Sequence, residues 1–259
     1  MKDIKEKISI VMPAYNEGGH IVSSIEEVAR TFQGFGCLWE LVVMDDGSGD
    51  DTYERAAEAA QGYPGLVSVK KNPFNLGKGR ALKKALRFVS GYYTVFIDAD
   101  LDLHPLQVRT LFDIMRLSNA DIVIGSKMHP NSVVDYPLER KLMSKVYYYL
   151  VRLLFNLPCH DTQTGLKLFK TEVLRNVFPR VLVKKFAFDL EVLANAHRLG
   201  YKIAEAPIVL TSQRRYGRIG PSAALATFWD TLAVFYRMYI IKYYDRIDNY
   251  RRKRMAGLS

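Results

Sequence analysis

Short apolar runs alternate with helical stretches through the first half of the sequence. The apolar runs predict buried strands at residues 8–12, 39–44, 66–70, 93–97 and 121–125. The stretches between them have helical spacing at residues 20–31, 52–60, 78–89 and 106–117. Strands that alternate with helices in this way predict an α/β fold, with a mostly parallel sheet flanked by helices.

The second half has longer helical stretches. Its pattern predicts helices at residues 138–156, 186–199 and 221–244, a loop leading into a strand at 161–170, and a strand at 203–210. The last helix places one set of apolar side chains on one face: Leu225, Phe228, Trp229, Leu232, Phe235, Tyr236, Tyr239 and Tyr243. Such a C-terminal amphipathic helix is typical of a membrane interface, and equally of a helix packed on its own domain or on a partner.

The composition indicates which partners the protein's charge favours and which redox compartment its cysteines suit. The 259 residues are 49% hydrophobic and 25% charged, which is typical of a globular protein. The formal net charge of +10 favours anionic partners, namely nucleotides, nucleic acid or acidic lipid. Cys37 and Cys159 have no metal-ligand spacing and indicate thiols in a reducing compartment. Because no apolar signal core and no run of roughly 18 apolar residues occurs, we expect no membrane span in the chain itself.

Three polar clusters follow predicted strands, at residues 13–17, 45–48 and 98–102. In open parallel sheets, ligands bind at the carboxyl ends of strands, so we expect these clusters to share one site. Asp98, Asp100 and Asp102 have carboxylates that suit a hard cation, Mg²⁺ or Mn²⁺, and an acidic turn or helix cap is the alternative. The metal would neutralise charge on a leaving diphosphate.

The other two clusters and a glycine pair leave alternatives open. Asp45 and Asp46 either form a turn or accept hydrogen bonds from a base or ribose. Tyr15 and Glu17 allow the same two interpretations, with an aromatic ring that can stack beside a polar acceptor. Lys78 lies between two glycines at the start of a predicted helix, where amide groups either face an anion or form a plain turn.

The ordered set of motifs resembles the family 2 glycosyltransferases, which have the GT-A nucleotide-diphospho-sugar transferase fold. The motifs are Val-Met-Pro-Ala-Tyr-Asn-Glu at residues 11–17, Asp-Asp-Gly-Ser at 45–48, Gly-Lys-Gly at 77–79 and Asp-Ala-Asp at 98–100. Asp-Thr-Gln-Thr-Gly-Leu-Lys-Leu-Phe at 161–169 and Phe-Asp-Leu-Glu at 188–191 resemble the polyprenyl-phosphate hexosyltransferases, dolichyl-phosphate glucosyltransferases above all, with the mannosyltransferases close behind. The resemblance covers roughly residues 8–210 and implies a catalytic domain at residues 1–212. Residues 213–259 would then form a basic loop, the amphipathic helix and a basic tail.

The resemblance implies a donor site for a nucleotide diphosphate sugar, UDP-glucose or GDP-mannose. The implied donor-binding residues are Pro13, Tyr15, Glu17, Asp45, Asp46, Lys78, Asp98, Ala99, Arg215 and Arg218. Asp100 joins Asp98 at the metal, and Asp102 stands where the family often has glutamine. Because a carboxylate is a harder ligand than an amide, this departure leaves the implied metal site intact.

An acceptor site for a polyprenyl (dolichyl-type) phosphate is implied in the same way. Its residues are Lys127, Arg140, Ser144 and Gln163. Lys127 stands where the family has arginine, so it keeps the charge and loses the bidentate geometry. Arg140 and Ser144 are four residues apart, on one face of a predicted helix. The alternative interpretation is that this face is an exposed helix surface that binds no phosphate.

The implied chemistry is inverting transfer, with Asp100, Asp161 and Arg140 as the catalytic residues. A lipid phosphate has a second pKa of about 6 and is already a nucleophile at neutral pH. A sugar hydroxyl, as in polysaccharide or glycolipid synthesis, would need a base, and Asp161 would supply it unless that residue only braces its loop.

A third class of function, a non-catalytic basic binding protein, is disfavoured because the carboxylate clusters repel phosphate unless a metal intervenes. We therefore expect no nucleic-acid partner. The expected place of action is the cytoplasmic face of a membrane, bound peripherally, with a membrane-protein partner left open.

Overall fold

A seven-stranded sheet organises this computed structural model. The structure describes all residues except 2–3, 135–137, 184–186, 211–220 and 256–259, and the side chains of residues 138–141, 221–224 and 251–255 are not described. The strands are β1 (Ile8–Ala14), β2 (Trp39–Asp45), β3 (Val67–Lys71), β4 (Tyr93–Phe96), β5 (Ile122–Ser126), β7 (Lys167–Lys170) and β8 (Ile203–Pro207). Their order is β3-β2-β1-β4-β7-β5-β8, and only β7 runs antiparallel to its neighbours among the described pairs. The predicted mostly parallel α/β sheet is confirmed.

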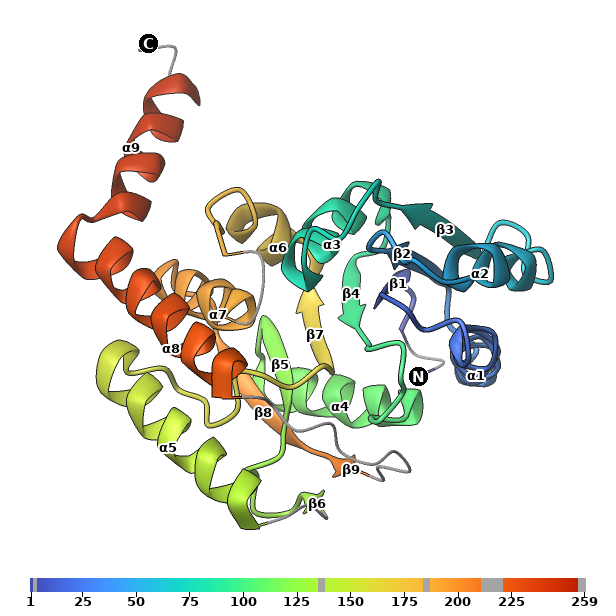
Figure 1. The fold of residues 1–259 in the computed structure, drawn as a ribbon, viewed down its shortest axis with the longest axis horizontal. Coiled ribbons are helices and arrows are strands. Elements are labelled where there is room, and N and C mark those ends of the chain that lie inside the picture. The colour runs from blue at the N-terminus through green and yellow to red at the C-terminus, as the bar shows by residue number, and fades with distance from the viewer. Residues whose placement is uncertain (2–3, 135–137, 184–186, 211–220, 256–259) are drawn as a thin grey trace.

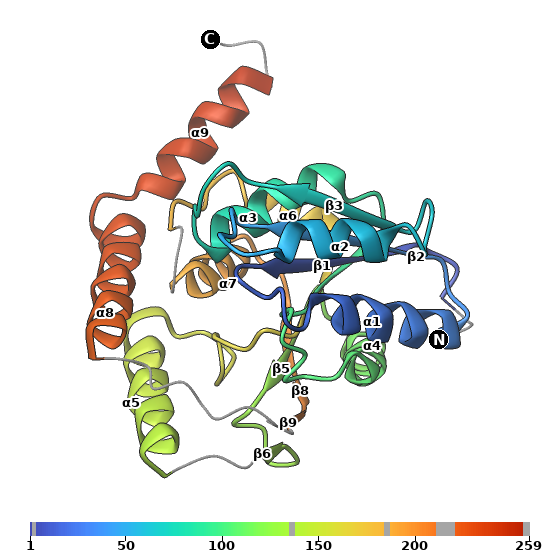
Figure 2. The ribbon, with the colours of Figure 1, turned by 45° about the vertical axis from the view of Figure 1, so that its right-hand side comes forward.

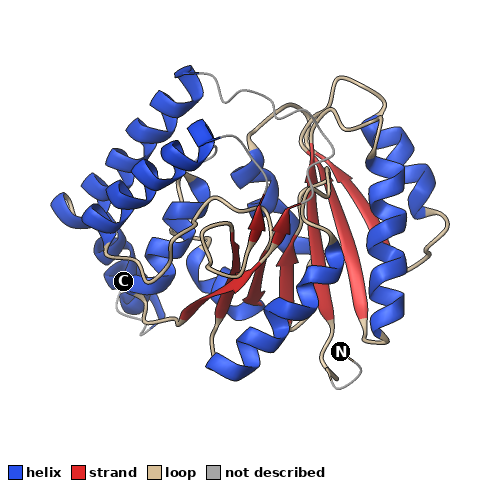
Figure 3. Ribbon diagram, turned by 90° about the horizontal axis from the view of Figure 1, so that it is seen from below, coloured by secondary structure: helices blue, strands red, loops and turns tan. Residues whose placement is uncertain are grey.

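Helices cover both faces of this sheet (Figures 1 and 3). One face carries α1 (Ile21–Phe35), α2 (Thr52–Ala60) and α4 (Val108–Ser118), and the other carries α3 (Lys78–Ala85), α6 (Thr171–Val177) and α7 (Phe188–Arg198). At the β8 edge, α5 (Leu138–Phe155) and α8 (Pro221–Phe235) lie side by side (Figures 1 and 2). A short parallel pair, β6 (Val133–Val134) and β9 (Val209–Leu210), lies outside the main sheet.

Side chains of the central strands alternate between two cores. In β1, Ile10 and Met12 pack against α1 and α4, whereas Val11 packs on the side of α3 and α7. The continuous apolar sequence of this strand reflects burial on both faces, as expected for a parallel sheet. The result is a three-layer arrangement with β1 and β4 at its centre, and the ends of these strands are where ligands bind in such folds.

Two predictions of local structure need correction. Pro13 was expected to end the first strand, but β1 continues to Ala14. The strand tolerates this proline because β4, its neighbour on one side, already ends at Phe96, opposite Val11. Beyond that point only β2 pairs with β1, and the missing N–H of Pro13 leaves no ladder bond unmade on the other side. Helix α6, which follows β7 directly, was not predicted, since seven residues are too few to show a clear period.

The C-terminal region also departs from the single helix expected at residues 221–244. The structure has α8, then a π-helix (Tyr236–Ile240), and a separate helix α9 (Tyr243–Met255). Lys242 between them has a φ of 49°, so the chain turns, and α9 projects from the body (Figures 1 and 2). The buried residues of these elements include Thr231, Val234 and Met238, and of the predicted face Phe235 and Tyr243 pack, partly buried, against the same core. Residues 251–254, expected as a tail, are part of α9.

A buried carboxylate ties α7 to this C-terminal region. Glu191 is 0% exposed and accepts the N–H groups of Leu182 and Val183 at 2.9 and 2.7 Å. Its other oxygen accepts the hydroxyl of Tyr244 and lies 3.4 Å from the Arg237 guanidinium. One side chain therefore holds together α7, the loop before it and the helices that end the chain.

A second cluster holds the first turns of α9. Asp248 accepts hydrogen bonds from Arg180 Nε and Arg198 Nη2, both at 2.5 Å, and Arg198 also pairs with Asp245 at 2.6 Å. Burial works to raise the pKa of Asp248, but the hydrogen bonds and charges of Arg198 and Arg180 outweigh it and hold this pKa below its usual range.

Candidate active site

A cavity of about 580 Å³ lies where β1, β2 and β4 end. It is lined by residues of all three predicted polar clusters and of three further segments: Pro13, Ala14, Tyr15, Glu17, Asp46, Asn75, Gly77, Lys78, Asp98, Ala99, Asp100, Gln163 and Asp189. The sequence therefore located the cavity correctly, at the carboxyl ends of parallel strands.

The loop that carries Tyr15 and Glu17 is fixed by the loop after β2. Asn16 has a φ of 55°, and its N–H donates to Ser48 Oγ at 2.9 Å. Its side-chain oxygen accepts the N–H of Gly49 at 2.9 Å, and the N–H of Glu17 donates to Thr52 Oγ1 at 2.8 Å. Asparagine tolerates this left-handed backbone well, so the turn presents the flanking side chains to the cavity with little strain.

Asp46 holds the glycine-containing loop rather than presenting an open carboxylate. Its Oδ1 accepts Asn72 Nδ2 at 2.7 Å and the N–H of Leu76 at 3.1 Å, and its Oδ2 accepts the N–H of Gly77 at 2.8 Å. Gly77 has a φ of 91°, a conformation that L side chains rarely adopt, and α3 begins at the next residue. The turn thus places Lys78 at the cavity wall.

Lys78 pairs with Asp98 across the cavity, with 2.5 Å between Nζ and Oδ1. Burial works to raise the pKa of Asp98, but the charge of Lys78 and its hydrogen bond outweigh it and hold that pKa below its usual range. Burial likewise works to lower the pKa of Lys78, and the carboxylates of Asp98 and Asp189 raise it above its usual value. Both groups are therefore charged at neutral pH.

Gly165 makes room for the Asp98 carboxylate. A Cβ atom at position 165 would lie 2.0 Å from Asp98 Oδ2, far inside van der Waals contact. This close approach gives a steric reason for glycine in the Asp-Thr-Gln-Thr-Gly motif, which sequence reasoning had used only as a family signature.

Of the three carboxylates expected at a metal, Asp98 and Asp100 line the cavity and Asp102 does not. The N–H of Asp102 instead donates to Asp100 Oδ1 at 3.2 Å, as in the acidic turn considered as the alternative. The described residues contain no group of three or more His, Cys, Asp or Glu side chains arranged to hold a metal ion.

Asp45 lies behind the cavity wall. It is 0% exposed, its Oδ1 accepts the N–H and hydroxyl of Ser48, and Lys71 Nζ lies 4.0 Å from its Oδ2. That Oδ2 makes no hydrogen bond within the described part of the chain. It does not line the cavity, so its expected contact with the nucleoside stays a prediction.

Asp161 makes the contacts of a loop brace. Its oxygens accept the N–H groups of Lys127 and Gln163, both at 3.1 Å, and the Lys127 ammonium lies 3.5 Å away. Neither Asp161 nor Lys127 lines the cavity. Asp161 and Lys127 thus contact each other outside the cavity lining, and their expected roles as base and acceptor contact stay predictions.

A carboxylate to which sequence reasoning gave no role, Asp189, does line the cavity. It follows the first residue of α7 and pairs with the buried Lys167 at 2.8 Å. Asn75 and Gly77 of the glycine-containing loop line the cavity beside Lys78. For Asp189 the available signal was the Phe-Asp-Leu-Glu motif, whose place opposite the strand ends depends on tertiary packing.

Comparison with known proteins decides the family. A family model described as glycosyl transferase family 2 matches residues 9–178. The chain belongs to this family. A dolichyl-phosphate β-glucosyltransferase of Trichomonas vaginalis is 31% identical over 249 residues, which are 92% of this chain and 76% of that protein. A dolichyl-phosphate β-glucosyltransferase of Dictyostelium discoideum is 29% identical, over 78% of this chain and 65% of that protein.

The fold of this glycosyltransferase is also that of solved structures. Glucosyl-3-phosphoglycerate synthase from Mycobacterium tuberculosis, in complex with Mn²⁺, uridine diphosphate and phosphoglyceric acid, matches with a TM-score of 0.69 and 23% identity. The match covers 90% of this chain and 80% of that one. The expected GT-A architecture is confirmed, and with it the assignment of the chain as a hexosyltransferase.

The acceptor residues expected for this glycosyltransferase are only partly described. Gln163 lines the cavity, and its Nε2 donates to Tyr147 of α5 at 3.4 Å. Ser144 lies on the same helix, half-buried and outside the cavity lining. The side chain of Arg140 and the whole of Arg215 and Arg218 lie outside the described residues.

Helices α5 and α8 of the glycosyltransferase each expose apolar side chains. On α5 these are Leu142, Met143, Val146, Tyr149 and Leu153. On α8 and the π-helix they are Leu225, Phe228, Trp229, Tyr236, Tyr239 and Ile240. No helix among the described residues is long and apolar enough to span a bilayer.

Proposed function

We propose that this glycosyltransferase transfers a hexose from UDP-glucose or GDP-mannose to a dolichyl-type polyprenyl phosphate, with inversion at the anomeric carbon. The observation that carries the proposal is the contact of Gln163 with Tyr147, because it joins a carboxylate-lined cavity to helix α5. That helix holds Arg140 and Ser144 and exposes an apolar stripe. The relatives named as dolichyl-phosphate β-glucosyltransferases support the acceptor class.

Asp98 and Asp100 would hold Mg²⁺ or Mn²⁺ with the donor. Their carboxylate oxygens are the hard ligands these cations prefer, and both line the cavity. Two carboxylates leave the remaining positions to diphosphate oxygens and water, which is a common arrangement for Mg²⁺. When bound, the metal neutralises charge on the departing nucleoside diphosphate. The Mn²⁺ and uridine diphosphate in the mycobacterial structure support this donor chemistry.

Cationic side chains complete the donor site in this proposal. Lys78 lies at the cavity wall and is charged at neutral pH. Arg215 and Arg218 are proposed to neutralise the diphosphate from the loop that follows β9. Electrostatic stabilisation of the leaving group by fixed charges lowers the barrier without any change in the protein's own covalent bonds.

The acceptor phosphate would bind along one side of α5. Arg140, Ser144 and Tyr147 are spaced i, i+4 and i+7, so they share a helical face that leads to Gln163. A phosphate monoester has a second pKa of about 6 and attacks without a general base. The protein's task is then to orient the phosphate in line with the anomeric carbon and to exclude water.

Transfer to a sugar hydroxyl is the second candidate, and it requires a base. Asp161 is engaged by Lys127 and Gln163, which leaves Asp189 as the cavity carboxylate without a proposed donor or metal role. The Lys167 ammonium lies 2.8 Å from Asp189, so this carboxylate is already engaged in an ion pair. This pairing favours the phosphate acceptor.

The apolar stripes of α5 and α8 are proposed to dock on the cytoplasmic face of a membrane that holds the lipid acceptor. On α5, Leu142, Val146, Tyr149 and Leu153 recur at helical spacing, and on α8 Leu225 and Trp229 do the same. Aromatic and aliphatic side chains on adjacent helices suit the interfacial region of a bilayer. The basic residues at 251–254 of α9 would add about 1 kcal/mol each near anionic lipid.

Flotation with anionic liposomes tests this docking. The chain should float at low salt and, more weakly, at high salt, because apolar burial persists when charges are screened. The double variant Leu153→Ser/Trp229→Ser should lose most of the floated fraction. Leu117→Ser on α4 is the control, since Leu117 is 84% exposed and Leu153 83%. Equal flotation of the two variants would assign the stripes to a protein partner instead.

The division of the chain at residue 212 stays a prediction. Val234, Met238 and Tyr244, all C-terminal to it, join the same hydrophobic core as Phe96 and Phe169 of the sheet. The C-terminal helices are therefore packed on the catalytic core in this structure.

A donor screen tests the proposed function. The chain is incubated with nucleotide sugars, a short polyprenyl phosphate and Mg²⁺ or Mn²⁺, and products are read by mass. We expect a polyprenyl-phosphate hexose from UDP-glucose or from GDP-mannose, formed only with metal. Turnover of neither donor in the presence of either metal would contradict the proposal.

A further inference from the structure

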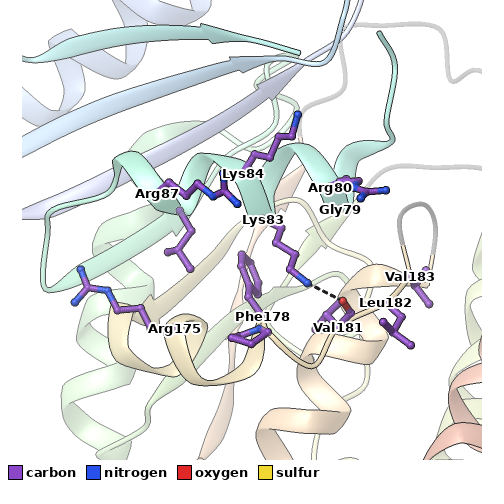
Figure 4. Close-up of a pocket in the computed structure, with 12 residues that line it drawn as sticks. Gly79, Arg80, Lys83, Lys84, Arg87, Arg175, Phe178, Val181, Leu182 and Val183 are labelled. Atoms are coloured by element: carbon purple, nitrogen blue, oxygen red, sulfur yellow. Dashed lines mark hydrogen bonds between the residues drawn. The ribbon is translucent and has the colours of Figure 1, made fainter. Parts of the chain in front are cut away.

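A second cavity, of about 670 Å³, lies between α3 and α6 (Figure 4). Its walls come from α3, from the 3₁₀ turn Leu86–Phe88 that follows it, from α6 and from residues 178–183. Of the helices, only α3 contributes residues to both this cavity and the donor cavity, and no residue lines both. The proposed glycosyl transfer gives this cavity no role.

The second cavity is rich in positive charge. Its lining includes five basic residues, Arg80, Lys83, Lys84, Arg87 and Arg175, and no described Asp or Glu. Lys84 donates to Asn72 Oδ1 at 2.8 Å, and Lys83 reaches across the cavity to the carbonyl of Val181 at 2.9 Å (Figure 4). Within the described residues, the guanidinium groups of Arg80, Arg87 and Arg175 have no carboxylate partner. One carboxylate, Glu191, lies behind the wall at Leu182 and Val183, and the five basic residues outnumber it, so the cavity is attractive to an anion.

The arginine side chains in the lining indicate which kind of anion the cavity would bind. Arginine presents a planar fork of N–H donors that matches the oxygens of phosphate, and Arg87 and Arg175 come from opposite walls at the same end of the cavity (Figure 4). Removal from water lowers the pKa of Lys83; the charge of Glu191 opposes this effect, and the charge of Arg80 adds to it. An anion bound beside Lys83 would favour its charged form.

The floor of the cavity is apolar. Leu86, Phe178, Pro179, Val181 and Leu182 provide it. A ligand with a phosphate group and an apolar body would satisfy both parts of the lining, whereas a small hydrated anion would use the arginines alone. The donor cavity has the opposite character, because Glu17, Asp98, Asp100 and Asp189 line it and repel phosphate when no metal is bound.

We propose that the cavity between α3 and α6 is a binding site for a phosphate group, separate from the donor cavity. The phosphate lies at the end of the cavity lined by Arg87 and Arg175, with Lys83 further along the α3 wall. The occupant is either a free phosphorylated compound or the headgroup of a phospholipid, and both present the same oxygens to these side chains.

The test uses the full chain in EDTA, so that the donor cavity holds no metal, and measures binding by calorimetry. Inorganic pyrophosphate is the probe for a free phosphate compound, and dioctanoyl phosphatidic acid below its micelle concentration is the probe for a lipid headgroup. Arg87→Ala/Arg175→Ala should weaken binding at least about tenfold, the loss expected for charge-assisted hydrogen bonds to phosphate. Arg109→Ala/Arg116→Ala, which removes two exposed charges from α4, should change it less than about twofold.

Saturable binding of either probe, lost in the first double variant and kept in the second, supports the site. Tighter binding of the lipid identifies a headgroup, and tighter binding of pyrophosphate identifies a free compound. Absence of saturable binding overturns the proposal, as does equal weakening in both double variants or unchanged binding in Arg87→Ala/Arg175→Ala. These readouts are independent of catalytic turnover, so failure of the proposed glycosyl transfer would leave them interpretable.

Discussion

The side chains around the donor cavity find their partners within the chain, whereas many large side chains of α5 and α8 are exposed to solvent. Around the donor cavity polar groups are fixed from within: Asp46 accepts three hydrogen bonds and Asp98 pairs with Lys78. On α5 and α8, large apolar groups such as Leu153 and Trp229 remain in solvent, 83% and 61% exposed. The first region is organised to receive a polar ligand without rearrangement, and the second presents a surface whose favourable partner lies outside the chain.

The largest effect is expected from Asp100→Asn, which tests the donor side of this comparison. Loss of one carboxylate at the proposed metal should reduce kcat/KM by roughly 10³-fold or more, about 4 kcal/mol of transition-state stabilisation. The circular dichroism spectrum and the melting temperature should stay close to wild type. Steady-state kinetics with saturating Mn²⁺ measure the loss.

Asp102→Asn is the matched control, because Asp102 does not line the cavity. A small effect there, beside a large one at Asp100, restricts the metal to Asp98 and Asp100. A loss as large as that of Asp100→Asn would restore Asp102 as a ligand, as the sequence predicted.

The second-largest effect is expected from Glu191→Ala, because Glu191 links α7 to the C-terminal helices. The change leaves two backbone N–H groups, the Tyr244 hydroxyl and the Arg237 guanidinium without their common acceptor. Removal of one partner from a buried ionic cluster costs about 3–5 kcal/mol of folding stability, so denaturant unfolding should shift accordingly. Glu172→Ala, an exposed glutamate on α6, should leave stability within about 0.5 kcal/mol of wild type. Comparable midpoints for the two variants would show that Glu191 is not a structural link.

Arg140→Ala tests the acceptor side. If its guanidinium binds the lipid phosphate, the acceptor KM should rise by an amount equivalent to roughly 1.5–3 kcal/mol, with little change in the donor KM. Lys145→Ala on the same helix serves as the control for a lost positive charge. A rise in the donor KM with an unchanged acceptor KM would place Arg140 on the other substrate.

The smallest effect concerns α9 and depends on pH. Because the pKa of Asp248 is held below its unfolded value, its contribution to stability is complete above about pH 4–5 and is lost as pH falls through the folded pKa. Asp248→Asn should therefore cost about 1–2 kcal/mol at pH 7, and the difference from wild type should shrink toward pH 3. Urea unfolding at a series of pH values measures it. A difference that is constant with pH would mean that the charge of Asp248 is not what holds α9.

The parts of the fold that were predictable depend on local pattern. β1 to β5 follow short apolar runs and α1 to α4 a helical period, and the strand ends located the cavity before any tertiary contact was known. Asp189 was missed because its entry into the cavity depends on how α7 packs. The contacts that Asp161 makes with Lys127 were not predictable, because Lys127 lies 34 positions away in the sequence.

The C-terminal turn was unpredictable for a different reason. The aromatic spacing through residues 235–243 continues a helical period, so nothing in it marks the left-handed residue Lys242. The basic residues of α3 were visible in the sequence as an amphipathic pattern. The cavity they form was not, because its other wall is α6, a helix of seven residues.

The central claim is that the acceptor is a phosphate on a polyprenyl chain. The most direct measurement compares polyprenyl phosphate with the polyprenol of the same length, using whichever sugar nucleotide is turned over, and reads the lipid products by mass. The account predicts a hexosylated product from the phosphate and none from the alcohol, since the site relies on an acceptor that is already ionised. Transfer to the alcohol or to a free sugar, with none to the phosphate, would contradict it.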